Sequence, residues 1–278
     1  MSAVGWRPAT MPAQRSRWIL PAVWRTRLEL RRLGREPVAL LTTLGLPVLV
    51  QLAAALPRVG PALTAVAGGT GRLTIGLVTI GIMLCSFANI AVGTSDEVMD
   101  GTLDRLRGTQ LPLSAYLAGK AMLALLTSLA LAATLLVLGM VLTGLTLPDR
   151  PAAWGWLALF LVLGTVAGTG LGVAAAAEPR TWMTVPAVYL VVAVLALASG
   201  SVVDPQRMPL WVSDFGLPFP VRWLGQGLRA ELLPGQVTSF DLGTAGGRWP
   251  VVGVLAAWAV VGLVQGLRGI RRMRDDAR

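Results

Sequence analysis

Residues 73–94 read LTIGLVTIGIMLCSFANIAVGT, an apolar run that contains no Asp, Glu, Lys or Arg. A helix needs about 20 mostly apolar residues to cross a hydrocarbon core of about 30 Å. This run is long enough to cross a bilayer as a helix, and it predicts an integral membrane protein.

Five further stretches of the chain have the same uncharged, apolar character. The six predicted spans cover residues 38–56, 73–94, 121–147, 154–177, 182–203 and 251–267. The sequence therefore predicts an all-α integral membrane protein with six transmembrane helices, folded as a single permease domain over residues 1–278.

The composition of the 278 residues agrees with lipid as the main solvent. Hydrophobic residues make up 54% of the chain and charged residues only 14%, where a soluble domain has about a quarter. The chain has no histidine, and its one thiol, Cys85, excludes a disulfide framework and a CxxC redox motif. Most classes of enzyme are therefore unsupported.

The net charge of +10 is best explained by membrane topology. Seventeen of the 24 Lys and Arg residues fall in the N-terminal arm, the C-terminal tail and the links between spans two and three and spans four and five. Cytoplasmic segments carry such an excess of cations. We expect a multi-pass protein of the cell membrane with both termini in the cytoplasm, and no nucleic-acid partner.

The basic segment 17–36 before the first span has the pattern of an interfacial helix. Pro21 suits the first helical turn and Gly34 suits a C-cap. In a helix, the apolar and small residues would share one face; they are Ala22, Val23, Thr26, Leu30 and Leu33. The opposite face would carry the charged residues Arg25, Glu29 and Arg32. The alternative is a basic stretch that only fixes topology.

The link between spans two and three, residues 95–112, has helical periodicity. Thr94 to Glu97 has capping-box spacing, and Gly108 and Pro112 mark an end. Met99, Leu103 and Leu106 would form an apolar face, with Asp100, Asp104 and Arg107 opposite. This predicts a short cytoplasmic helix. Two alternatives are a helical loop that binds nothing and a magnesium site formed by Asp96, Glu97, Asp100 and Asp104.

The same link carries a family resemblance. The run EVMDGTLDRL at 97–106, followed by TQLPLS at 109–114 and LAGK at 117–120, resembles a signature of ABC-2 type transporter permeases. The resemblance implies a coupling helix that docks on a separate nucleotide-binding ATPase subunit. The implied coupling residues are Glu97, Asp100, Gly101, Thr102, Leu103, Asp104, Arg105 and Leu106.

A second match lies in the external segment 204–249, where MPLW at 208–211 and FGLPFP at 215–220 resemble a stretch before the family's last span. Pro209 and Pro220 can each open a short helix. In the second helix, Val221, Leu224, Leu228 and Leu232 share one face. The resemblance implies a re-entrant hairpin that closes the pathway, with Trp211, Phe215, Leu224 and Leu228 as gate residues. The alternative is a pair of interfacial helices that anchor the last span.

The energy source must lie outside this chain. No span contains an acidic residue or histidine that could couple transport to an ion gradient, and the chain lacks a phosphate-binding loop, Lys120 being its only lysine. We expect no cofactor on this chain, with ATP and Mg on a partner ATPase. Candidate pathway residues are Gln51, Asn89, Pro47 and Pro186.

The combined prediction is the translocation subunit of an ABC exporter that moves a hydrophobic or amphiphilic drug or natural product outward. A second permease copy is expected, as a homodimer or a heterodimer. Two alternatives are a lipid or lipid-linked glycan exporter and a membrane assembly subunit without flux. The small residues Gly164, Gly168 and Gly172 recur every four residues, which favours close helix packing within the chain over a subunit interface.

Overall fold

The computed structural model describes residues 26–32, 34–35, 37–101, 113–177, 185–204, 207–233 and 247–275. Every regular element in these ranges is a helix, which confirms the all-α prediction for this part of the chain. The first described element is a short helix at residues 26–32, which we call the N-terminal helix. The elements after it are α2 (Pro37–Leu40), η1 (Leu41–Gly45), α3 (Leu46–Ala53), α4 (Gly60–Ala67), α5 (Thr70–Met83), η2 (Leu84–Ala88), α6 (Asn89–Met99), α8 (Leu113–Thr143), α9 (Pro151–Ala176), α10 (Val185–Ala198), α11 (Leu210–Gly216), α12 (Pro220–Leu232) and α13 (Trp249–Asp275).

Four helices are long and apolar enough to cross a membrane: Thr70–Met99, Ala115–Thr143, Pro151–Ala176 and Trp249–Gly269. They match the second, third, fourth and sixth predicted spans. The first and fifth predicted spans correspond to the shorter apolar helices Leu41–Ala53 and Val185–Ala198. Residues 178–184, where the fifth predicted span begins, lie outside the described ranges.

Two of the helices contain a turn of π-helix. The first, η1, precedes Pro47, whose ring cannot share the turn with the carbonyl of Thr43 in a regular α-helix. The second, η2, lies inside the long helix Thr70–Met99, and there the Ser86 hydroxyl donates to the Ile82 carbonyl at 2.6 Å. Both turns interrupt the helix locally without ending it.

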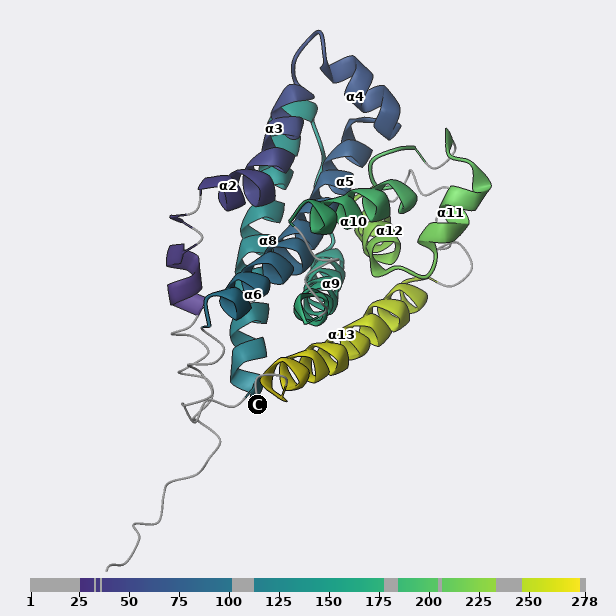
Figure 1. Ribbon diagram of the computed structural model, residues 1–278. Coiled ribbons are helices and arrows are strands. Elements are labelled where there is room, and N and C mark those ends of the chain that lie inside the picture. The colour runs from purple at the N-terminus through teal and green to yellow at the C-terminus, as the bar shows by residue number, and fades with distance from the viewer. Residues whose placement is uncertain are drawn as a thin grey trace, which may run out of the picture.

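Helix α9 lies at the centre of the bundle, among α5, α6, α8, α12 and α13 (Figure 1). Its glycines permit this position. A Cβ on Gly164 would lie 3.0 Å from Leu224 of α12, and one on Gly172 would lie 2.7 Å from the Phe87 carbonyl. A Cβ on Gly168 would collide with Ser86. The predicted glycine stripe is therefore a packing surface within the chain.

Helix α13 runs along α9 (Figure 1). The two backbones meet at Gly170 and Gly262, and a Cβ built on either glycine would collide with the backbone of the other helix. Close approach of this kind is typical of helices that associate in lipid, because small residues let backbones touch. The pair α9 and α13 is thus fixed by glycine in both helices.

Helix α4 was not predicted from the sequence. It lies in residues 57–72, between the first two predicted spans, where no helix was expected. Pro61 stands in its first turn, and Gly68 ends it in a left-handed conformation, with φ of 77°. The backbone N–H of Asp204 donates to the Val66 carbonyl at 2.9 Å, and Arg72 lies 3.6 Å from the Asp204 carboxylate. These contacts tie α4 and α5 to the segment that follows α10.

Candidate functional site

A buried group of charges lies where α6 ends and α8 begins. The Lys120 ammonium is 3.0 Å from Oε1 of Glu97 and 3.5 Å from Oε2 of Glu29. The Tyr116 hydroxyl donates to the second oxygen of Glu97 at 2.9 Å. The side chain of Lys120 is only 2% exposed. We call these four residues the charge cluster.

The cluster joins three separate segments of the chain. Tyr116 and Lys120 are four residues apart on α8 and therefore share one face of that helix. Glu97 belongs to the last turns of α6, and Glu29 belongs to the N-terminal helix. The Thr26 hydroxyl adds a second link, because it donates to the Gly119 carbonyl of α8 at 3.3 Å. The N-terminal helix is thus attached to both α6 and α8.

Removing Lys120 would take from both carboxylates of the cluster the ammonium that lies 3.0–3.5 Å from them. Breaking a buried ion pair from one side typically costs 3–5 kcal/mol. By contrast, the neighbouring pair of Arg32 and Asp96, at 3.5 Å, joins side chains that are 41% and 37% exposed, and such pairs contribute about 1 kcal/mol at most. The attachment of the N-terminal helix therefore depends chiefly on Lys120.

The predicted capping box does not start a helix. Thr94 lies fully buried inside α6, which continues from η2 without a break and ends at Met99. The capping-box spacing was misleading because the same residue types also fit the interior of a helix whose preceding turn is already formed. Gly101, two residues after the last helical residue, Met99, adopts a left-handed φ of 65°, as is common just beyond the end of a helix.

The predicted coupling residues divide into three groups. Glu97 is 5% exposed and is bonded within the chain to Lys120 and Tyr116. Asp100 is exposed, and a Cβ on Gly101 would meet nothing within 4 Å, so both stand at an open surface. The remainder lie outside the described residues; they are Thr102, Leu103, Asp104, Arg105 and Leu106.

The carboxylates of this region do not fit the magnesium alternative. Glu97 would be a central ligand, but both of its oxygens already accept hydrogen bonds, from Lys120 and from Tyr116. Within the described ranges, no three His, Cys, Asp or Glu side chains come together as a metal site would require. Asp104 falls outside those ranges. A structural role for Glu97, in which it joins α6 to α8, explains its contacts better than metal binding does.

The structure does not bring the four pathway candidates together. Gln51 is fully buried, and its amide donates to the Thr74 hydroxyl at 3.0 Å. Asn89 is half-buried at the start of α6, fifteen residues beyond Thr74 and therefore about 22 Å along the same helix. Pro47 is buried one turn before Gln51, whereas Pro186 is exposed on α10.

The external segment contains the two predicted short helices, α11 after Pro209 and α12 starting at Pro220. Of the predicted gate residues, Trp211 is 74% exposed and Phe215 is 52% exposed. Leu224 and Leu228 are instead buried in the core of their own chain, where Leu224 faces Gly164 of α9. The apolar stripe of α12 therefore packs on the flank of the spans.

The opposite face of α12 is buried as well. Arg222, Gln226 and Arg229 are each at most 5% exposed, although side chains of these types usually face water. At the end of α12, Glu231 is 1% exposed and accepts two hydrogen bonds from the guanidinium of Arg248, which raises the pKa of Arg248. Helix α12 is thus enclosed by α5, α9, α10 and α13.

Sequence reasoning missed the charge cluster, because it used Lys120 for the family resemblance, the charge count and the search for a phosphate-binding loop, and assigned it no partner. A usable signal was present. Lys120 is the single lysine of the chain, and it immediately precedes the apolar run 121–147. A charge beside such a run requires a partner, and Glu97 follows the preceding apolar run. The pairing with Glu29 had no comparable signal.

The comparisons with known proteins agree with this architecture. A family model described as ABC-2 type transporter matches residues 23–233, which include Glu29, Glu97, Tyr116 and Lys120. No curated protein matches the chain. Because the family model covers well over half of the 278 residues, the chain belongs to the ABC-2 type transporter family, as a membrane subunit.

Proposed function

We propose that this chain is the translocation subunit of an ATP-driven exporter and that a separate ATPase subunit docks where α6 ends. The observation that carries the proposal is the charge cluster within the family match. A docking surface needs a rigid connection to the spans, and the cluster supplies one directly beside Asp100 and Gly101. The proposed docking segment is residues 97–106.

The packing indicates how a displacement at this segment would reach the spans. Lys120 and Glu97 hold the end of α6 against α8, and α6 continues through η2 into α5. Helices α5, α6 and α8 all pack on α9. A movement imposed on the docking segment by ATP binding would therefore shift the helices around the centre of the bundle together.

The test is charge reversal at the exposed Asp100, in the complex with its ATPase. Asp100→Lys should uncouple ATP hydrolysis from transport, because charge at an interface guides and orients docking. Asp149→Lys is the matched control: it makes the same change at an exposed position between α8 and α9. Normal transport and normal stimulation of ATP hydrolysis in Asp100→Lys would contradict the proposed docking segment.

We propose a hydrophobic or amphiphilic compound, such as a drug or natural product, as the substrate. Support comes from the spans: the described spans bury threonine, serine and glutamine side chains among apolar ones, as a pathway for an amphiphile would require. A second permease copy, identical or related, would complete the pathway. Lipid or lipid-linked glycan export remains the second candidate, and a subunit without flux the third.

Uptake into everted membrane vesicles would separate these substrate classes. ATP-dependent accumulation of a hydrophobic dye supports drug-type export, whereas ATP-dependent movement of a labelled lipid with no dye uptake supports the second candidate. ATP hydrolysis in the complex without movement of either probe would favour the subunit without flux.

A further inference from the structure

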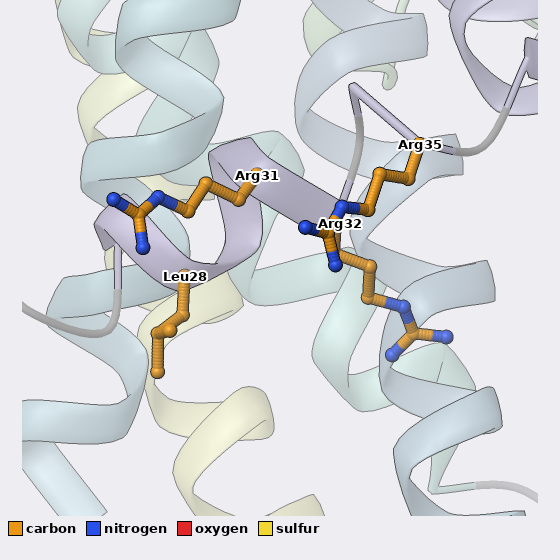
Figure 2. Close-up of a pocket in the computed structure, with 4 residues that line it drawn as sticks. All are labelled: Leu28, Arg31, Arg32 and Arg35. Atoms are coloured by element: carbon orange, nitrogen blue, oxygen red, sulfur yellow. The ribbon is translucent and has the colours of Figure 1, made fainter.

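The N-terminal helix has a pocket on the side that faces away from the charge cluster. The pocket has a volume of about 310 Å³ and is lined by Leu28, Arg31, Arg32 and Arg35. Figure 2 shows Leu28, Arg31 and Arg32 on the helix, and the Arg35 side chain running from the following turn back toward the end of that helix. Three arginine residues and one leucine therefore line a single recess.

The other side of the same helix is fixed to the protein. Thr26 is bonded to Gly119, and Glu29 faces Lys120 and is only 13% exposed. These contacts prevent the helix from rotating its arginines inward. They also remove the one carboxylate of the helix from the pocket side, so that the pocket keeps its positive charge.

Two of the pocket arginines have no protein counter-charge in the part of the chain that the structure describes. Arg31 and Arg35 are exposed, and no described carboxylate lies within 4.0 Å of either. Arg27, one helical turn before Arg31, is likewise exposed. Arg32 is paired at 3.5 Å with Asp96. The surface thus presents cationic groups that are open to an anion from outside.

An apolar side chain accompanies these cations. Leu28, which lines the pocket, is 42% exposed, which is unusual beside so many charges in a helix that faces water. Leucine and arginine side by side suit the boundary between headgroups and acyl chains, where the leucine enters the apolar layer and the guanidiniums reach phosphates. The neighbouring Lys120 stands at the start of the apolar part of α8, which places the pocket near that boundary.

We propose that this pocket binds the phosphate headgroup of an anionic phospholipid in the adjacent leaflet. A guanidinium offers a planar pair of N–H donors that matches a phosphate, and basic recesses at the membrane surface recognise anionic headgroups in this way. Leu28 favours a lipid over a soluble phosphate, because only a lipid brings an acyl chain to cover it. This site is independent of the exporter's substrate.

The test uses the purified full chain, stripped of lipid and then exposed to phosphatidylcholine with or without phosphatidylglycerol, with bound lipid measured by native mass spectrometry. The unaltered chain should retain phosphatidylglycerol in preference. Arg31→Gln/Arg35→Gln should weaken that binding roughly 30-fold, because each guanidinium near an anionic headgroup contributes roughly fivefold in affinity. Arg58→Gln/Arg150→Gln, two exposed arginines of other loops, is the matched control and should bind normally.

Four outcomes would overturn the proposal. The first is equal phosphatidylglycerol binding by the double variant and the unaltered chain. The second is an equal loss in the control. The third is binding of glycerol phosphate as tight as that of the lipid, which would indicate a site for soluble phosphates. The fourth is normal lipid binding with loss of the ATPase from the complex, which would make the patch a protein-docking surface.

Folding is checked by the midpoint of thermal unfolding in neutral detergent, which should not change, since Arg31 and Arg35 are exposed. Should the double variant be unstable, Arg31→Gln and Arg35→Gln alone give the same test at roughly fivefold each. The lipid-binding measurement needs neither ATPase nor transport substrate, and the ATPase complex is prepared only to look for the fourth outcome. A failure of the lipid-binding proposal is therefore distinguishable from a failure of the proposed exporter function.

Discussion

At the scale of single residues, Lys120 is the position where we expect a substitution to lower the stability of the fold most. Its ammonium compensates two carboxylates from two other segments, and it is 2% exposed. Replacement by the uncharged Met keeps a similar length but removes the ammonium that lies 3.0 Å from the buried Glu97 carboxylate. We expect Lys120→Met to lower the free energy of unfolding by about 3–5 kcal/mol. Thermal unfolding of the purified chain in detergent measures this.

A double-mutant cycle provides the control for this prediction. Glu97→Gln removes the buried carboxylate, so Lys120→Met/Glu97→Gln should recover part of the stability that Lys120→Met loses. Glu29 loses the same ammonium in both variants that carry Lys120→Met, so its contribution cancels from the comparison. If the two single effects simply add in the double variant, Lys120 and Glu97 do not stabilise each other, and the central contact of the cluster is misread.

Tyr116 gives a smaller and independent residue-level prediction. Its hydroxyl donates one hydrogen bond to the ionised Glu97, and such bonds contribute about 1.5–3 kcal/mol. Tyr116→Phe should therefore destabilise the chain less than Lys120→Met, while leaving the helical content by circular dichroism unchanged. A loss as large as that of Lys120→Met would mean that Tyr116 has a packing role beyond this bond.

At the scale of helices, local sequence signals predicted where helices begin and end more reliably than which helices pack against each other. Pro220 opens α12 as expected, and the apolar runs near residues 73–94 and 154–177 became helices α5 to α6 and α9. The burial of both faces of α12 could not be predicted, because an amphipathic pattern implies that one face is exposed to water. In the structure that face is covered by segments distant in sequence, and the periodicity of a single segment carries no information about such contacts.

The contact of α9 with α13 yields an element-level prediction. A Cβ on Gly262 would lie 2.7 Å from the Ala167 carbonyl, a backbone atom that cannot move aside as a side chain would. Gly262→Ala should therefore lower the unfolding midpoint, despite the better helix propensity of alanine. Gly253→Ala, on the same helix but with nothing within 4 Å of the new Cβ, should leave the midpoint unchanged or raise it.

At the scale of the whole molecule, the contacts place five segments at one end of the bundle. The N-terminal helix, the end of α6 and the start of α8 meet at Lys120. The end of α13 joins them, since a Cβ on Gly269 would lie 2.9 Å from Ala177 and one on Gly266 would lie 3.6 Å from Leu117. The Lys and Arg residues of the sequence are concentrated in and next to these segments, and on that ground we predict that this end of the bundle faces the cytoplasm.

The first apolar helix, Leu41–Ala53, is shorter than the length criterion for a span requires. Gln51, near its end, bonds to Thr74, whereas Glu29 of the separate N-terminal helix lies 3.5 Å from Lys120 of α8, which also contacts Glu97. Thr74 and Glu97 are 23 residues apart on Thr70–Met99, a rise of about 35 Å. The N-terminal helix and the first apolar helix together therefore extend along most of this long helix, and we predict that the first apolar helix crosses the membrane.

Cysteine labelling tests this arrangement. In a Cys85→Ala background, Val59→Cys and Asp149→Cys should react with an impermeant thiol reagent in intact cells, because both exposed sites stand beyond the outer ends of their helices. Met99→Cys, 59% exposed, should react only after the membrane is permeabilised. If the first helix did not cross, a further cysteine placed before it, Arg27→Cys at an exposed position, would react in intact cells as Val59→Cys does, and that pattern would reduce the chain to fewer than six spans.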